Sequence, residues 1–277
     1  MPSSRWRRSV APCTVALDVT PETLILLFVA ALTAGFVDAI AGGGGLVTVP
    51  ALLWAGLPPV AVLATNKLQG FAGALASTLT FGRAGHLELR TFAPAVVLSA
   101  LGGLLGALVV HAIDPGAART LIPILLVAAS LHFLFSPRVA DHETTPRMAM
   151  AWFALGPVAA IGFYDGFFGP GAGSFFTLAL VGLLGLGLRR ATAHARLLNV
   201  ASNGAAFAVF LLGGEIVWAA GLVMVAGQIL GAWLGSRAAI TWGARLIRPL
   251  LVVMALATTV KILTAPDQPL GMWLRRF

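Results

Sequence analysis

The sequence predicts an all-α, polytopic integral membrane protein with about eight transmembrane helices. Its composition is 58% hydrophobic and 10% charged with a mean hydropathy of +0.93, a balance that a soluble domain of 277 residues does not have. Apolar stretches of about 20 residues recur along the chain, each long enough to cross the hydrocarbon core as a helix. They are continuously apolar and do not alternate as barrel strands would, which indicates helices.

The expected spans cover residues 21–41, 60–81, 91–111, 118–135, 148–168, 191–212, 217–236 and 247–264. Two further apolar segments, residues 46–56 and 174–186, are too short to cross alone. Each follows a glycine run, so the sequence predicts glycine-broken or re-entrant short helices there. Residues 1–20 are expected to form a polar N-terminal tail, and residues 265–277 a C-terminal tail.

The spans are expected to form two tandem repeats. Gly35-Phe36-Val37-Asp38 recurs as Gly162-Phe163-Tyr164-Asp165, a spacing of 127 positions (162 − 35). Gly102 and Gly106 were matched to Gly227 and Gly231, at a similar spacing. The first repeat covers residues 21–136, a hydrophilic connector 137–147, and the second repeat 148–264. Four spans in each repeat would make them point the same way, whereas a fifth would invert them; four are favoured, but both arrangements stay open.

The net charge of +8 fits membrane topology better than nucleic-acid binding, because the cations fall between spans. Counting eight spans places one group of cations on the more positive, cytoplasmic side, together with both termini. That group is Arg5, Arg7, Arg8, Arg83, Arg90, Arg138, Arg147, Lys261, Arg275 and Arg276. The opposite side would hold Arg119, Arg189, Arg190, Arg237 and Arg245. Cys13 is the only cysteine, which excludes an internal disulfide and a cysteine-based metal cluster.

The glycine runs are candidate substrate-binding loops. Gly43 and Gly44 belong to the run 42–45, and Gly171 and Gly173 to the run 169–173. Glycine runs at membrane depth are tolerated where they line a cavity, and paired interruptions in two repeats indicate a transport site. Close helix packing is the alternative, and it is favoured only for glycines spaced every four residues. A phosphate-binding loop is excluded because the Lys-Ser/Thr that should follow is missing.

Two cations inside spans are the second part of the candidate site. Lys67 and Arg196 lie at corresponding places in the two repeats. Charged residues at such depth are costly and usually face a cavity or a partner. Neutral amides accompany them at Asn66, Gln69, Asn199 and Asn203. With the N-termini of the short helices, they favour a small anion. The alternative is that the cations snorkel, or only neutralise Asp38 and Asp165.

Asp38, Asp165 and His194 are candidates for coupling or loop capping. The two aspartates could relay protons, bind a coupling cation or cap the glycine turns, and capping is the first expectation. The histidines lack metal-ligand spacing with a carboxylate, so neither a metal nor a cofactor is expected.

At these residues the sequence resembles the sulfite exporter TauE/SafE family, also called the 4-toluene sulfonate uptake permease family. The resemblance covers about residues 22–264 and rests on residues 35–45, 64–67 and 162–173. It implies a permease of the bacterial inner membrane that moves sulfite, sulfoacetate or another organosulfonate, linked to the proton gradient. Its partners would be that sulfur anion and the lipid bilayer; the resemblance leaves homo-oligomerisation open.

Two other functions stay open at this point. An intramembrane enzyme acting on a lipid phosphate could use the same cations to hold its substrate, with Asp38 or His194 as base. An anion channel, or a subunit that transports nothing, would make the polar symmetry a packing device. A repeated site at the midplane suits alternating access better than chemistry on a headgroup, whereas saturation and counterflow would separate a carrier from a channel.

Overall fold

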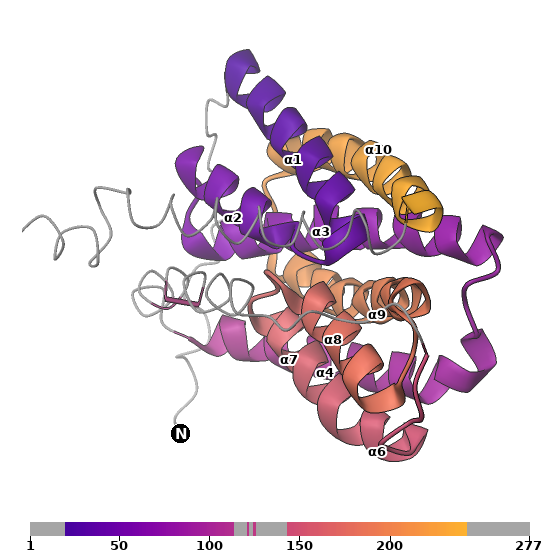
Figure 1. Ribbon diagram of the computed structural model, residues 1–277. Helices are drawn as coiled ribbons and strands as arrows, with labels where there is room; N and C mark the ends of the chain where they lie inside the picture. The colour runs from indigo at the N-terminus through magenta and orange to yellow at the C-terminus, as the bar shows by residue number, and fades with distance from the viewer. Residues whose placement is uncertain (1–19, 114–120, 122–123, 126–142, 243–277) are drawn as a thin grey trace, which may run out of the picture.

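The structure is a computed structural model that describes residues 20–113, 121, 124–125 and 143–242. Every regular element in these residues is helical (Figure 1), so the predicted all-α membrane fold is confirmed. The elements are α1 Pro21–Ala41, α2 Gly45–Trp54, α3 Pro59–Arg83, α4 Leu89–Ala112, α6 Met150–Phe153, η1 Ala154–Val158, α7 Ala159–Phe167, α8 Ala172–Leu184, α9 Leu188–Gly213 and α10 Trp218–Trp242. Most of the expected span 118–135, the whole span 247–264, residues 1–19 and the C-terminal tail lie outside the described residues.

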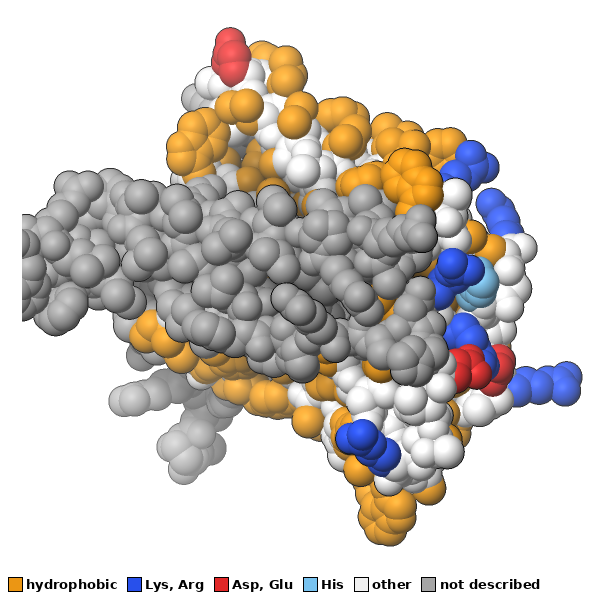
Figure 2. Space-filling view, in the orientation of Figure 1, with side chains coloured by type: hydrophobic (Ala, Val, Ile, Leu, Met, Phe, Trp, Pro, Cys, Tyr) orange, Lys and Arg blue, Asp and Glu red, His pale blue; other side chains and the backbone are white. Residues whose placement is uncertain are grey.

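Four of these helices, α1, α4, α9 and α10, are long and apolar enough to cross a membrane. Helix α3 is as long, but it carries polar side chains at residues 65–67 and 69. Helices α2 and α8 are short and apolar, as predicted. Leucines and tryptophans cover much of the outer surface (Figure 2), which suits a protein whose solvent is lipid.

The expected span 148–168 is interrupted by a π-helical turn. Helix α6 runs into η1, which contains Pro157, and then into α7. Proline has no N–H and its ring meets the carbonyl four residues earlier, so an α-helix cannot continue regularly through it. The wider π-helical turn accommodates the proline. Prolines and π-helical turns are common causes of local helix distortion.

Glycines allow two helix pairs to pack backbone against backbone. Helix α1 packs on α10 and α4 packs on α7. A Cβ added at Gly106 would lie 2.1 Å from the carbonyl oxygen of Phe163, and one at Gly231 would lie 2.0 Å from that of Leu32. Small residues at these positions let the helix backbones approach each other closely, as is expected of helix pairs in lipid.

The contacts correct the register of the second half of the repeat. Gly102 faces Ala159 and Phe163, whereas Gly231 faces the corresponding Leu32 and Phe36. Gly231 is therefore the counterpart of Gly102, a spacing of 129 (231 − 102), and the match of Gly102 to Gly227 was wrong. Glycine recurs every fourth position in both helices, so sequence alone fits either register.

Gly106→Ala is expected to lower the free energy of unfolding by about 1–3 kcal/mol, because the methyl group would force α4 from α7. Thermal unfolding in detergent micelles measures this effect. The matched control is Gly182→Ala in α8, where a Cβ meets nothing within 4 Å. Equal melting temperatures for the two variants would contradict the packing role of Gly106.

The helices of the two expected repeats run in opposite directions. Helix α1 is parallel to α10, since Phe28, Leu32 and Phe36 face Gly227, Gly231 and Gly235 in the same order. Helix α7 is likewise parallel to α4. Glu215, just before α10, pairs with His111 at the end of α4, whereas Ala239 near the end of α10 packs with Phe81 at the end of α3, close to where α4 begins. Helices α4 and α10 therefore run antiparallel to each other. The first-half helices therefore point opposite to their expected counterparts, as inverted repeats would.

This geometry corrects the assignment of charges to the two sides. Arg190 pairs with Glu88 and Glu143, and burial, with Arg189 and Arg190 nearby, lowers the pKa of His86 in the loop between α3 and α4. These contacts, with Phe81 packed against Leu188 and Ala239, bring six arginines to one end of the molecule, here called the arginine end: Arg83, Arg90, Arg147, Arg189, Arg190 and Arg237. Figure 2 shows Lys and Arg side chains gathered toward one edge of the visible face.

The prediction that Arg189, Arg190 and Arg237 lie opposite Arg83 was therefore wrong. The chain turns back at α8, whose end pairs with residues 144 and 147, so α9 starts at the arginine end. Helix α1 starts at the other end.

Candidate functional site

The two glycine breaks meet in the middle of the molecule. The hydroxyl of Ser174 donates to the carbonyl oxygen of Ala41, and a Cβ at Gly45 would lie 2.8 Å from the Cα of Pro170. Gly42 and Gly171 have φ values of +86° and +88°, a left-handed conformation that strains other residues. These turns bring the first residues of α2 and α8 together, so two positive helix N-termini face one region.

Lys67 forms a closed polar cluster with Asp165. Its Nζ lies 2.9 Å from Oδ1 of Asp165 and also donates to the backbone oxygen of Asp165 and to the side-chain oxygen of Asn203. The other carboxylate oxygen, Oδ2, accepts from the amides of Asn199 and Asn203 at 2.8 Å and from the hydroxyl of Ser202. The side chains of Lys67 and Asp165 are 0% and 2% exposed. All three ammonium donors are used, so this cluster is satisfied without a ligand.

Arg196 forms a second ion pair between the two halves of the chain, but an incomplete one. Its NH1 lies 2.9 Å from Oδ2 of Asp38, and Oδ1 of Asp38 accepts the backbone N–H of Gly44 at 2.9 Å. The Arg196 side chain is 0% exposed, whereas that of Asp38 is 19% exposed. Within the described part of the chain, Nε and NH2 of Arg196 have no hydrogen-bond partner. Buried guanidinium donors without partners are costly, which makes them candidates for binding a ligand.

NH2, one of the two unpartnered nitrogens of Arg196, lies directly behind two glycines. An added Cβ would lie 2.0 Å from NH2 at Gly173 and 2.8 Å from it at Gly42. Lys67 has the same relation to Gly169, at 2.6 Å. Each cation therefore occupies the space in which the Cβ of any other residue would lie, so these positions require glycine.

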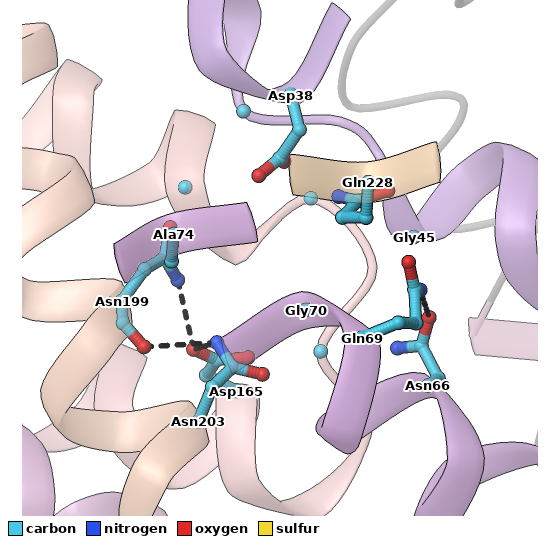
Figure 3. A pocket seen from close by; sticks show the side chains of 14 residues that line it. Asp38, Gly45, Asn66, Gln69, Gly70, Ala74, Asp165, Asn199, Asn203 and Gln228 are labelled. Atoms are coloured by element: carbon cyan, nitrogen blue, oxygen red, sulfur yellow. Dashed lines mark hydrogen bonds between the residues drawn. The ribbon is translucent and has the colours of Figure 1, made fainter. Parts of the chain in front are cut away.

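A small polar pocket opens beside these pairs. Figure 3 shows Asp38 and Gln228 on one side of it and Asp165, Asn199 and Asn203 on another. Its lining is Asp38, Gly42, Gly45, Asn66, Gln69, Gly70, Ala74, Asp165, Gly169, Gly171, Gly173, Asn199, Asn203 and Gln228. The two cations do not line it themselves, but stand behind its glycine wall. The wall seen from inside is thus polar and carries two carboxylates.

The amides of the pocket include two oxygens without partners. Thr48 and Gln69 both donate to the side-chain oxygen of Asn66, at 2.6 and 2.8 Å. Among the described residues, the side-chain oxygens of Gln69 and Gln228 have no partner. Sequence reasoning missed Gln228 and Ser202, although a glutamine inside the apolar span of α10 was a signal for the first.

The remaining sequence candidates take different places. Gly43 and Gly44 lie in the turn before α2 and outside the pocket lining, with Gly44 holding Asp38. His194 lies away from the pocket: its Nε2 accepts the backbone N–H of Glu88 at 3.1 Å, and its Nδ1 bonds the carbonyl oxygen of Arg190 at 2.8 Å. Both ring nitrogens are used to hold the start of α4 against α9. In the described residues, no group of three or more His, Cys, Asp and Glu side chains could hold a metal.

Comparison with known proteins gives a consistent result. The family model described as sulfite exporter TauE/SafE matches residues 27–262. The chain is 46% identical to a probable membrane transporter protein, ORF9, of Sinorhizobium sp, over 93% of this chain and 98% of the relative. It is 44% identical to the probable membrane transporter protein YfcA of Escherichia coli K12, over 92% of this chain and 96% of the relative. No solved structure matches the chain significantly.

Proposed function

Because the chain belongs to the sulfite exporter TauE/SafE family, and is therefore a multi-pass membrane transporter and not an enzyme, we propose that it carries a small sulfur-containing anion. Sulfite, sulfoacetate and other organosulfonates are the proposed cargo. The proposed membrane is the bacterial inner membrane, and the proposed driving force is the proton gradient.

One observation supports an anionic cargo above the others. The N-termini of α2 and α8 meet at a polar pocket, and behind its wall lies the buried guanidinium of Arg196 with two donors unused. Helix N-termini and guanidinium groups are the two devices with which proteins hold oxyanions such as sulfonate and sulfite.

The proposed binding residues follow from this geometry. The N-terminal glycines of α2 and α8 would hold the anion by backbone N–H groups, with Arg196 as its charge partner. Asn66, Gln69, Asn199, Asn203 and Gln228 would supply neutral hydrogen bonds. Lys67 would act on the cargo only through Asp165, because its donors are already occupied.

Counterflow in proteoliposomes tests the proposal. Liposomes loaded with unlabelled sulfite should accumulate labelled sulfite transiently, and sulfoacetate should compete while sodium chloride should not. Saturation and counterflow separate a carrier from a channel. Uptake that rises linearly with concentration and shows no counterflow would favour the channel instead.

The orientation in the membrane is also a proposal. The arginine end carries six cations at helix ends and in the loop before α6, whereas the other end carries none among the described residues. Positive loops stay in the cytoplasm, so the arginine end is proposed to be cytoplasmic. The start of α1 would then lie on the outer side. The expected cytoplasmic termini lie outside the described ranges, and this proposal puts the start of α1 on the opposite side of the membrane from the one expected for the N-terminal tail.

Cysteine labelling in whole cells is expected to distinguish the two ends. In a Cys13→Ser background, a cysteine at Glu215 should react with a membrane-impermeant maleimide, because this partly exposed residue lies at the end opposite the arginines. A cysteine at Glu143 should react only after the cells are broken. The reverse pattern would mean that the arginine end faces outward.

A further inference from the structure

We propose that Asp38 takes up a proton together with each bound anion, whereas Asp165 stays ionised and holds the two halves together. This inference rests on the proposed function and assigns its coupling to one of two carboxylates that look equivalent in sequence. The assignment comes from a difference between the surroundings of the two aspartates.

The repeat is not symmetrical where the aspartates lie. With the corrected spacing of 129, the residues that correspond to Asn199, Ser202 and Asn203 of α9 are Gly70, Gly73 and Ala74 of α3. The first three donate to Oδ2 of Asp165. Glycine and alanine donate no side-chain hydrogen bond, and Gly70 and Ala74 line the pocket together with Asn199 and Asn203. Asp38 therefore lacks the three neutral side-chain donors that Asp165 has.

The two carboxylates consequently differ in how firmly the ionised form is held. Asp165 receives the ammonium of Lys67 and three neutral donors, and its side chain is 2% exposed. Asp38 has one guanidinium nitrogen and one backbone N–H, and its side chain is 19% exposed at the pocket wall. Hydrogen bonds to a carboxylate stabilise its charged form. Asp38 is thus the carboxylate that can change charge without disrupting a closed cluster.

Charge balance requires such a change. Asp38 with Arg196, and Asp165 with Lys67, make two neutral pairs. A monovalent anion added to this pocket leaves one uncompensated negative charge in a region of low dielectric constant, which is strongly unfavourable. A proton on Asp38 cancels that charge and releases NH1 of Arg196 to the anion. The proton comes from the aqueous phase and adds to one carboxylate oxygen; no other bond changes.

No other described group competes for this role. Helices α2 and α8 carry no titratable side chain, and α10 contributes only Arg237, at the arginine end. From α9, Arg196 faces Asp38, while His194 is occupied at the start of α4. Lys67 of α3 and Asp165 of α7 lie across the pocket and hold each other.

Proton uptake on ligand binding tests the inference. The purified full-length protein in weakly buffered detergent solution would be mixed with methanesulfonate, a fully ionised probe, while an indicator dye reports pH; sulfite would follow with a protein-free correction. Wild-type protein should take up about one proton per anion, and its affinity should fall about tenfold per pH unit above neutrality. Asp38→Asn should bind the anion with no proton uptake and little pH dependence. Glu215→Gln, a carboxyl outside the pocket, should behave as wild type.

The outcomes separate the two proposals. Anion binding without proton uptake in the wild type, or full uptake in Asp38→Asn, would overturn the role of Asp38 while leaving the anion site intact. Absence of binding by every sulfonate and by sulfite would overturn the proposed function itself. If Asp38→Asn does not fold, Asp38→Glu keeps the test decisive, since it should retain uptake with altered affinity.

Discussion

Replacing Arg196 with Gln is expected to reduce anion counterflow by about 10- to 100-fold while the protein stays folded. The variant removes the charged side chain whose two unpartnered nitrogens lie behind the glycine wall, and a hydrogen bond to a charged group contributes about 1.5–3 kcal/mol. Asp38 keeps the backbone N–H of Gly44 and some exposure to the pocket, so its carboxylate is not stranded. Initial rates in proteoliposomes, normalised to reconstituted protein, measure the effect.

Arg237→Gln is the matched control, since Arg237 lies at the arginine end with its guanidinium 4.1 Å from the ring centroid of Trp233. It should transport at the wild-type rate. Arg196→Lys should recover part of the flux, because an ammonium restores the charge without the planar pair of donors. Wild-type counterflow in Arg196→Gln would contradict the proposed site.

Replacing Lys67 with Met is expected to destabilise the protein by about 3–5 kcal/mol, because it leaves the carboxylate of Asp165 buried without its cation. The matching variant Arg196→Met should cost less, since Asp38 is 19% exposed and Asp165 only 2%. Unfolding in detergent micelles, followed by the loss of helical signal, gives the comparison.

The double variant Lys67→Met with Asp165→Leu separates stability from transport. It removes both charges and should regain much of the lost stability, because replacing a whole buried pair by apolar residues is often neutral. If Lys67→Met alone were as stable as the wild type, the cluster around Asp165 would not be what holds the two halves together.

The lengths of the apolar segments made most of the fold predictable. The described long helices α1, α3, α4, α9 and α10 each overlap an expected span, and the short helices α2 and α8 follow the glycine runs as expected. Hydropathy reports that a segment is buried in lipid but not on which side it ends. The turn at α8, and with it the opposite directions of the helices, could therefore not be read from the sequence.

The sequence predicted which residues belong to the candidate site, but not which of them form ion pairs with each other. Lys67, Arg196, Asp38 and Asp165 stand out because charge is rare in such spans. That each cation pairs with the aspartate of the other half depends on the tertiary arrangement. The inequality of the two pairs comes from Gly70 and Ala74, residues that look unremarkable in an apolar helix until they are compared with Asn199 and Asn203.

The glycine contacts also limit how the molecule can rearrange during a transport cycle. Helix α1 of the first half is pressed against α10 of the second, and α7 of the second against α4 of the first, at distances that leave no room for even a methyl group. The two halves of the sequence cannot separate as two rigid bodies without breaking the contacts of α1 with α10 and of α4 with α7. We therefore expect α1 to move together with α10, and α4 together with α7, during a transport cycle.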